Sequence, residues 1–473
     1  MTSTATPADA ASTQRGVRFA YYGDDFTGST DTLSSVVQGG WRAALFMKVP
    51  DAAQLAAFGE LDCVGVAGTA RAMSPAEMDA ALPDIFRGLA ATGADVVHYK
   101  TCSTFDSAPH IGSIGHAVQL AQSVLGSQPA MIVGGQPNLG RYCAFGNLFA
   151  RAGQQGAVYR LDRHPTMSRH PVTPMDEADL ARHLAKQGLA RIAGVDVVAL
   201  SAADTNARVD AALADAPDAL LFDVLEPSHL VAVGRQLWRQ AEKRGPLLTV
   251  GPTGAAQALL AALPASGQGG VSGELSTGAK KEATSQGSAN ISAGGTAQAA
   301  TAHAVSQTLI VAGSRSPVTA AQIRHAEQAG FVSIELDPVL LADSQSSLVP
   351  LIEQVLDALR SGRSVVAHTT FADDSHGRTA GFTRALAVGS GRLVREVLAV
   401  HPLARVGLAG GDTSSLAVES WGITALTLAY ILAPGVGVCR VHAAGHPLDG
   451  IELMLKGGQM GPPDVFEALL AGT

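Results

Sequence analysis

Short apolar runs alternate with amphipathic stretches along most of this chain. In the first half, runs typical of buried strands occur at 63–67, 96–99, 131–133, 197–200, 220–224 and 247–250. In the second half, such runs occur at 308–313, 332–336, 364–368, 405–409 and 436–441. Helical patterns lie between most of them. Strands that alternate with helices are typical of a largely parallel sheet covered by helices, so the pattern predicts an α/β fold.

Two segments lack this pattern and divide the chain. Between 264 and 301, Gly, Ser, Ala, Thr and Gln dominate, which is typical of a flexible linker or a disordered insertion. Residues 1–15 lack the basic start and apolar core of a signal peptide, so we expect a disordered tail. We therefore predict two α/β domains with largely parallel sheets facing a cleft, at 16–262 and 306–473, joined by a flexible linker at 263–305.

Composition narrows the class of protein. A chain of 473 residues with 47% hydrophobic and 16% charged residues is globular and long enough for two domains. Its net charge of -8 argues against a broad nucleic-acid surface, and no apolar run is long enough to span a bilayer. The four cysteines are scattered without a C-x-x-C pair, which disfavours a disulfide framework or a zinc cluster. We expect a cytoplasmic protein without nucleic-acid or membrane partners.

An acidic turn follows the first apolar run and precedes a helical pattern. It contains Asp24, Asp25 and Asp31, together with Thr27 and Gly28. Three carboxylates so close together repel one another unless a cation or a hydroxyl-rich ligand uses them. We expect Asp25 to act as a base or hydroxyl anchor, and Thr27 and Gly28 to offer backbone N–H groups to an anionic substrate. The alternative is structural, with Asp24 capping a turn and Asp31 starting a helix.

Cations and hydroxyls follow two other predicted strands of the first half. Lys100, Ser103 and Thr104 come after the run at 96–99, and Arg141 follows the run at 131–133 by a short turn. Arg141 is suited to bidentate binding of a carboxylate. The alternative for Lys100 is that its side chain only extends from the strand end to place the ammonium in water.

A proline-bracketed loop contains Arg169 and His170. Its prolines make it stiff, and it precedes a helical pattern at 176–189. A substrate contact and a rigid connection are both consistent with this pattern.

Glycine-centred turns occur in the second half at 313–316, 410–415, 435–437 and 457–461. Glycines let the backbone approach phosphates, and helix N-termini with hydroxyls complete an anion site, although loops also contain Gly and Ser for turn geometry alone. The candidate nucleotide-binding residues are Ser314, Ser316, Gly410, Gly411, Asp412, Thr413, Gly457, Gly458 and Gly461.

Several well-known motifs are absent. No G-x-G-x-x-G follows the first strand, which disfavours the usual dinucleotide fold, and there is no Walker A loop or protein-kinase motif set. The sequence also lacks G-x-S-x-G and H-E-x-x-H, so serine hydrolase and zinc protease hypotheses have no local support.

Taken in order, these motifs resemble the four-carbon acid sugar kinase family over nearly the whole chain except the tail and the linker. The family's opening D-D-x-T-G-x-x-D is similar to residues 24–31, which is the most specific match. Further similarities lie at its lysine-containing S-T motif (100–104), its Gly-Arg turn (140–141), its H-P-x-T-P-M loop (170–175) and its nucleotide-binding turns (313–316, 410–413 and 456–461).

The resemblance implies an ATP-dependent kinase of small acid sugars, with the sugar acid in the N-terminal domain and ATP in the C-terminal one. Asp25 would orient or deprotonate the attacking hydroxyl, and Arg141 or Lys100 would hold the substrate carboxylate. Mg²⁺ would bridge the phosphate oxygens, with no ligand residue assigned. Phosphoryl transfer then requires the two domains to close around a cleft. A homo-oligomer is left open.

Two departures from the family pattern bear on the substrate. Many tetronate kinases carry S-T-L-R-G where this chain has Ser103-Thr104-Phe105-Asp106-Ser107, and the final turn reads Lys456-Gly457-Gly458-Gln459-Met460-Gly461 in place of K-S-G-N-F-G. In having Asp106 at the position of that Arg, the chain is similar to the 3-oxo-acid branch of the family. The resemblance thus favours 3-oxo-tetronate or 3-oxo-isoapionate, with D-threonate or D-erythronate as alternatives. A non-catalytic two-domain sugar-acid sensor and a hydroxy-acid dehydrogenase are hypotheses of other classes.

Overall fold

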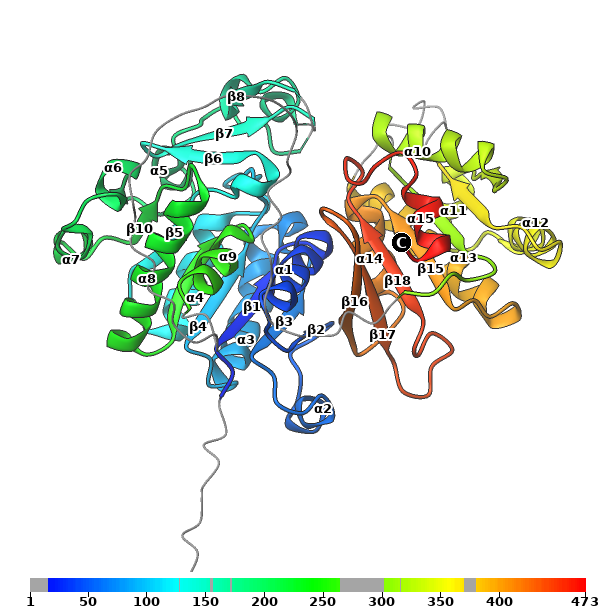
Figure 1. Ribbon diagram of the computed structural model, residues 1–473, viewed down its shortest axis with the longest axis horizontal. Helices are drawn as coiled ribbons and strands as arrows, with labels where there is room; N and C mark the ends of the chain where they lie inside the picture. Colours follow the sequence, from blue (N-terminus) through cyan, green and yellow to red (C-terminus); the bar gives the residue numbers. More distant parts are fainter. Residues whose placement is uncertain are drawn as a thin grey trace, which may run out of the picture.

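The computed structural model describes residues 16–473 except 127, 154–155, 171, 264–301, 315 and 370–379. The predicted tail and most of the predicted linker lie outside the described residues. Figure 1 shows two lobes side by side, the blue-to-green N-terminal half and the yellow-green-to-red C-terminal half.

The N-terminal half contains parallel strands in the order β2-β3-β1-β4-β11-β5-β10-β9. Their bounds are β1 Phe19–Gly23, β2 Ala43–Phe46, β3 Cys63–Ala67, β4 Val96–Lys100, β5 Ala130–Val133, β9 Ile192–Val195, β10 Ala219–Phe222 and β11 Leu247–Gly251. The helices are α1 Phe26–Gln38, α2 Ala52–Ala57, α3 Pro75–Ala91, α4 Ile114–Leu125, α5 Leu180–Ala185, α6 Val197–Leu200, α7 Thr205–Ala214, α8 Pro227–Arg244 and α9 Gly254–Ala261.

Both faces of this sheet are buried, as β1 illustrates. Because successive side chains of a strand point to opposite faces, Phe19 and Tyr21 pack in the cluster that contains Leu33 of α1, while Ala20 and Tyr22 pack with α3 and α4. Strands buried on both faces are expected to be continuous apolar runs.

The C-terminal half continues the sheet in the order β13-β14-β12-β15-β18-β17-β16, with β17 antiparallel to both of its neighbours. The strands are β12 Leu309–Ala312, β13 Val332–Glu335, β14 Val365–His368, β15 Arg405–Ala409, β16 Ala425–Ala433, β17 Val436–His442 and β18 Glu452–Lys456. The helices are α10 Pro317–Gln328, α11 Pro338–Ala342, α12 Val349–Arg360, α13 Ala380–Val400, α14 Gly411–Glu419 and α15 Val465–Ala471.

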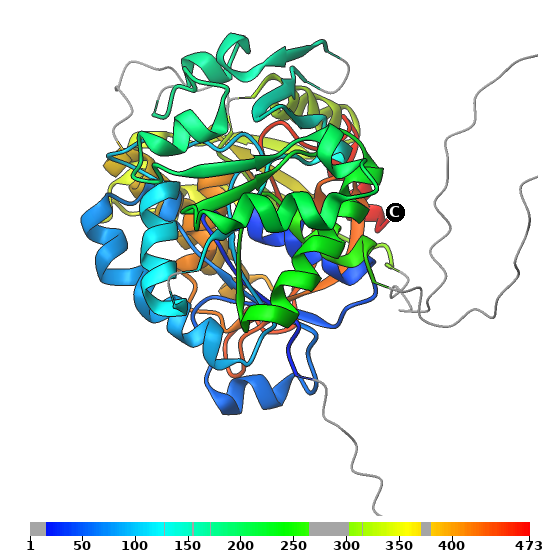
Figure 2. The same ribbon diagram turned by 90° about the vertical axis from the view of Figure 1, so that its left-hand side faces the viewer.

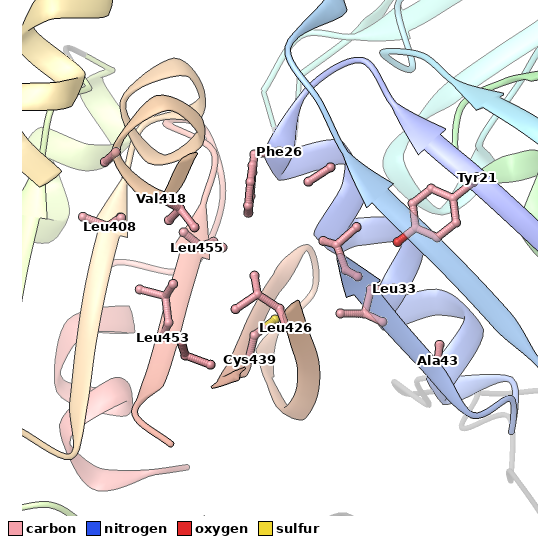
Figure 3. Packing of buried hydrophobic residues seen from close by; sticks show 14 of the residues in the cluster. Tyr21, Phe26, Leu33, Ala43, Leu408, Val418, Leu426, Cys439, Leu453 and Leu455 are labelled. Carbon is pink, nitrogen blue, oxygen red and sulfur yellow. The ribbon is translucent and has the colours of Figure 1, made fainter. Parts of the chain in front are cut away.

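The two halves share one sheet. β2 pairs antiparallel with β16, which places Leu45 opposite Leu426 and produces a continuous 15-stranded sheet. One apolar cluster follows a single face of this sheet through both halves. Figure 3 shows Phe26 and Leu33 of the N-terminal half opposite Val418 and Leu455 of the C-terminal half. The α/β prediction with largely parallel sheets is confirmed, and the antiparallel junction is an addition to it.

A smaller antiparallel sheet, β6-β7-β8, lies at one end of the N-terminal half (Figure 1 and Figure 2). It contains β6 Arg141–Ala144, β7 Asn147–Arg151 and β8 Val158–Arg160, and the short helical turns of this half are η1 Ala70–Ala72, η2 Pro137–Leu139, η3 Leu161–Arg163 and η4 Met167–Arg169. Within the described residues, no helix is both long enough and apolar enough to cross a membrane.

Two predicted elements of the N-terminal half were wrong. The run at 197–200 forms the helix α6, because Asp196 accepts a hydrogen bond from the Ala199 N–H at 2.8 Å and so caps a helical turn. So short an apolar run does not distinguish a strand from a buried helical turn. The helix predicted at 176–189 is limited to Leu180–Ala185, capped by Asp179.

Candidate active site

The acidic turn joins β1 to α1, and Asp25 is the N-cap of that helix. Its backbone is extended, and its Oδ1 accepts a hydrogen bond from the Gly28 N–H at 2.7 Å. A Cβ added at Gly28 would lie 2.4 Å from both Asp25 Oδ1 and Lys100 Nζ. A side chain at this position would have to displace the carboxylate and the ammonium, which converge over the Gly28 backbone. Asp25 and Lys100 come from β1 and β4, which are neighbouring strands.

Arg71 ties the acids together and was missed by sequence reasoning. It lies on η1, after β3, the other neighbour of β1. Its Nη2 and Nε donate to the two carboxylate oxygens of Asp24 at 2.9 and 3.3 Å, and its Nη1 lies 2.6 Å from Asp25 Oδ2. The available signal was its place after a strand, since three neighbouring strands deliver Asp25, Arg71 and Lys100 to one edge.

Asp24 and Asp25 share one guanidinium, but their pKa values shift in opposite directions. Burial raises the pKa of Asp24, and the charge of Asp25 adds to this rise against the opposing effect of Arg71. Burial acts on Asp25 too, but Arg71, Lys100 and the Gly28 hydrogen bond together outweigh it and lower the pKa of Asp25. Asp25 is therefore held as a carboxylate.

Asp31 lies one turn further along α1. Its Oδ2 accepts hydrogen bonds from Thr253 Oγ1 at 2.5 Å and from Gln136 Nε2 at 3.2 Å. It also lines a cavity of about 440 Å³ between α1, the η2 turn and the β16–β17 hairpin, which places it at the junction of the two halves.

Lys100 and its following loop are buried beside the acids. The Lys100 side chain is 3% exposed, and its Nζ donates to the Thr101 carbonyl at 2.8 Å. Thr104 is buried with its Oγ1 3.0 Å from Cys102 Sγ, whereas Ser103 is half-buried. Of these residues, Lys100 is therefore the one that the structure brings to Asp25.

Arg141 and Asp106 each present an unsatisfied buried atom. Arg141 donates from Nη1 to backbone carbonyls, including that of Leu139 at 3.0 Å, while its Nε has no hydrogen-bond partner. Asp106 is 7% exposed, and its buried Oδ1 also lacks a partner. Burial lowers the pKa of Arg141, and the charges of Cys102 and then of Asp106 act against this lowering. Arg141 and Asp106 therefore face related surroundings. They form no ion pair with each other, although one is a donor and the other an acceptor.

Phe105 precedes Asp106 in an uncommon conformation. It is fully buried, with a φ of 55° that bulky side chains rarely adopt. Such conformations persist where the surrounding structure fixes them, often at ligand sites. The buried Phe105 ring thus fixes the loop that presents Asp106.

Arg169 and His170 lie in the η4 turn and the loop that follows it. Arg169 is exposed, and His170 is half-buried with its Nδ1 accepting from the Thr173 N–H at 3.1 Å. The described contacts of these two residues are local, and a substrate role for them stays a prediction.

In the C-terminal half, Ser314 and Ser316 lie against the turn at 456–461. A Cβ added at Gly458 would lie 2.1 Å from Ser314 Oγ, and Ser316 is the N-cap of α10. Gln322 of α10 donates from Nε2 to the carbonyls of Met460 and Gly461 at 3.0 and 3.1 Å. The buried Gln322 therefore fixes the turn at 456–461, a positioning role that no motif indicated.

The third turn joins β15 to α14. Gly410, at a φ of 127° that suits glycine, is the N-cap of α14 and donates its N–H to the Lys456 carbonyl at 2.9 Å. Gly411, Asp412 and Thr413 form the first turn of this helix. A Cβ added at Gly411 would meet only Thr27 Oγ1, at 3.9 Å, so its surroundings are otherwise open.

Thr27 connects the acidic turn to the glycine turns. Its Cγ2 would lie 3.7 Å from a Cβ at Gly457, and its buried Oγ1 has no hydrogen-bond partner. The adjacent Phe26 N–H donates to Ser415 Oγ of α14 at 3.2 Å. The structure thus brings the predicted substrate residues at the start of α1 to the predicted nucleotide turns.

Two family models cover both halves of the chain. Residues 19–259 match a sugar-binding N-terminal domain, and residues 309–466 match a nucleotide-binding C-terminal domain. The chain is 40% identical over 480 residues to the 3-oxo-isoapionate kinase of Paraburkholderia graminis, which covers 97% of this chain and 96% of that relative. The chain belongs to the four-carbon acid sugar kinase family. The resemblance found in the sequence is confirmed.

More distant relatives are also similar to this chain over most of its length. The 3-oxo-tetronate kinase of Methylobacterium radiotolerans is 29% identical over 452 residues, covering 94% of this chain and 96% of that relative. A crystal structure from Salmonella typhimurium LT2 aligns with a TM-score of 0.72 at 22% identity, over 95% of this chain and 98% of that one, and supports the fold alone.

This family member has no preformed metal cage among its described residues. No group of three or more His, Cys, Asp or Glu side chains is arranged to hold a metal ion there. The carboxylates of Asp24 and Asp25 are engaged by Arg71, and Asp31 by Thr253. Magnesium commonly keeps several waters and binds through substrate phosphates, for which no dedicated cage is needed.

Proposed function

We propose that this protein is an ATP-dependent kinase that phosphorylates a primary hydroxyl of a small 3-oxo sugar acid, such as 3-oxo-tetronate or 3-oxo-isoapionate. The observation that carries the proposal is the position of Thr27 between Gly411 and Gly457. A donor phosphate on the glycine turns and a hydroxyl at the acidic turn would then be neighbours. The names of the two kinase relatives support this substrate class.

The sugar acid would bind between Arg141 and Asp106. A hydroxy acid has an anionic end and hydroxyls that donate, which complements the unpartnered Nε of Arg141 and the unpartnered Oδ1 of Asp106. Satisfying two buried polar atoms with one ligand also removes the cost of leaving them unpaired. Arg141 is therefore our choice over Lys100 for the carboxylate, because Lys100 already converges with Asp25.

Asp25 would orient the attacking hydroxyl, and Lys100 with Arg71 would keep Asp25 ionised. Phosphoryl transfer depends mainly on positioning and charge stabilisation, so a strong base is not required. The unpartnered hydroxyl of Thr27 is suited to donate to the transferred group. Magnesium would arrive with ATP and neutralise phosphate charge, and we assign it no protein ligand.

The packing at the start of α1 would exclude water from the transfer. Phe26 is 3% exposed and lies in the apolar cluster that crosses between the halves (Figure 3). Water excluded from this region cannot compete with the sugar hydroxyl for the phosphoryl group. We also propose a cytoplasmic location, which is compatible with the free state of all four cysteines.

The test is ADP release with magnesium-ATP over a panel of four- and five-carbon sugar acids. We expect turnover with 3-oxo acids, and weaker turnover with D-threonate and D-erythronate. Binding of an acid without any ADP release across the panel would replace the kinase with a sensor. NAD⁺ in place of ATP is the control for a dehydrogenase.

A further inference from the structure

A buried lysine lies beneath the glycine turns, and none of the carboxylates that the structure describes pairs with it. Lys456 ends β18, pairs with Ala409 of β15 and is 0% exposed. Its Nζ donates to Thr319 Oγ1 of α10 at 3.3 Å. No ion pair joins Lys456 to an acidic residue of the described chain, and burial alone, without a contributing charge, lowers the pKa of its ammonium to about 8.

The surroundings make this cation unfavourable when nothing is bound. A charge taken out of water is costly unless a partner of opposite sign compensates for it. The side chain also lies against the first turns of α10, and the N-terminus of a helix carries a positive partial charge. Two positive features at one place favour either loss of the lysine proton or binding of an anion there.

The neighbouring residues indicate which anion this is. Thr319, the hydrogen-bond partner of Lys456, donates in turn to the Gly458 carbonyl at 2.9 Å. Gly458 lies against Ser314 Oγ and close to Ser316, which caps α10. The ammonium is thus adjacent to the glycine turn, the serine hydroxyls and the helix N-terminus, a combination suited to phosphate oxygens.

We propose that the ammonium of Lys456 binds the phosphate chain of the nucleotide beside Ser314 and Gly458. This inference rests on the proposed kinase function and adds a nucleotide-binding residue to it. The competing explanation is structural, in which Lys456 only supports the Gly458 turn through Thr319.

The proposal predicts proton uptake on binding, because a phosphate anion beside the ammonium raises its pKa. At pH 8.5 the ammonium of the free protein is mostly deprotonated, and bound phosphate restores the proton. At pH 7 the lysine of the free protein is already protonated, so nucleotide binding takes up few protons. Nucleotide phosphates are fully ionised at pH 8.5 and contribute no proton of their own.

The experiment compares Lys456→Met and Lys456→Gln with the wild type and with Thr319→Val. Thermal shifts are measured with ADP, with inorganic tripolyphosphate and with adenosine, and proton uptake on ADP binding by calorimetry at pH 8.5 in buffers of different ionisation enthalpy. The Gln variant keeps an amide donor for Thr319, and Thr319→Val removes the hydroxyl that a structural role requires.

We expect both Lys456 variants to weaken ADP and tripolyphosphate binding about ten- to a hundredfold, the range for a charge-assisted hydrogen bond, and to lose proton uptake. Adenosine binding and the melting temperature without ligand should not fall. Thr319→Val should keep the ADP shift. Unchanged tripolyphosphate binding in the Lys456 variants, or an equal loss in Thr319→Val, overturns the proposal. A wild type that responds to none of the three ligands instead contradicts the nucleotide site itself.

Discussion

The backbone N–H of Phe26 donates to Oγ of Ser415 at 3.2 Å, and the same hydroxyl donates to the Gly411 carbonyl at 2.8 Å. One buried serine thereby connects the acidic turn of the N-terminal half with the glycine turn of the C-terminal half. The two halves of the site are held in register by this serine and by the β2–β16 pairing, in addition to apolar packing.

Ser415→Ala should therefore reduce turnover as well as stability. Removing the hydroxyl leaves the Phe26 N–H without its acceptor, which costs about 1–3 kcal/mol for a buried group. Because the lost bond spans the two half-sites, we expect part of this cost in the transition state, seen as a decrease in kcat of about tenfold. Steady-state kinetics and thermal melting measure the two effects.

Ser420→Ala is the matched control, because Ser420 Oγ donates locally to the Ala417 carbonyl at the end of the same helix. This variant should keep its turnover. If Ser415→Ala melts earlier but keeps full turnover, the bond contributes to stability and does not position the site.

Asp25→Asn should decrease turnover by about 10- to 100-fold, because the attacking hydroxyl loses the charged hydrogen-bond acceptor that orients it. Asn retains an oxygen for the Gly28 N–H, so the helix cap is preserved while the charge facing Arg71 and Lys100 is lost. ATP affinity should hardly change. The control is Asp51→Asn, which alters the exposed cap of α2. Turnover like the wild type would remove Asp25 from the mechanism.

Much of the fold could be predicted because buried parallel strands are continuous apolar runs. The run at 63–67 coincides with β3, Cys63–Ala67, for this reason. The junction of β2 with β16 could not be predicted, since the choice between two sheet edges distant in sequence depends on packing that no local pattern contains. The pattern also contains no signal that separates a four-residue strand from the helical turn α6.

The site was predictable to the extent that neighbouring parallel strands end at one edge. Asp25 and Lys100 each follow a predicted strand, and the structure brings the two side chains together because these strands are neighbours. Arg71 escaped because it lies in a short turn with no acid near it in the sequence, and its partners come from another strand. The orphaned oxygen of Asp106 is a property of packing, which a sequence alone does not reveal.

Asp106→Asn should raise the KM of the sugar acid about ten- to a hundredfold, because the substrate hydroxyl loses a charged acceptor. The melting temperature should not fall, since no protein hydrogen bond to Oδ1 is lost. Asp223→Asn is the contrasting control: Asp223 accepts from the Phe145 and Gly146 N–H groups, so this variant should lose stability and keep its KM. An unchanged KM in Asp106→Asn would exclude contact with the substrate.

Arg71→Gln should shift the acid limb of the pH profile of kcat/KM upwards by about one to three units, the effect of a nearby opposite charge on a carboxyl pKa. Asp25 has its pKa lowered in the folded protein, so the wild type should keep its ionised form down to acidic pH and lose activity only below the ordinary carboxyl range. Without the guanidinium, burial dominates and protonation begins at higher pH. Arg42→Gln, which removes an exposed arginine paired with Glu60, should leave the profile in place. If the acid limbs of the kcat/KM profiles lie at the same pH in Arg71→Gln and the wild type, Asp25 does not control the loss of activity at acidic pH.

Gly411→Val should raise the KM of ATP at least about tenfold without unfolding the protein, because a 1.4 kcal/mol loss of affinity corresponds to tenfold. A Cβ at Gly411 meets only Thr27 Oγ1, at 3.9 Å, so the free protein has room for the side chain. The branched side chain would occupy the space through which phosphate reaches the backbone at the start of α14.

Gly194→Val is the control, because Gly194 of the edge strand β9 also has open space around it and lies outside the site. The KM of the sugar acid should stay constant in both variants, and the ADP-induced thermal shift should decrease only in Gly411→Val. An unchanged KM for ATP in that variant would place the phosphates away from α14, at the Ser314 and Gly458 turns alone.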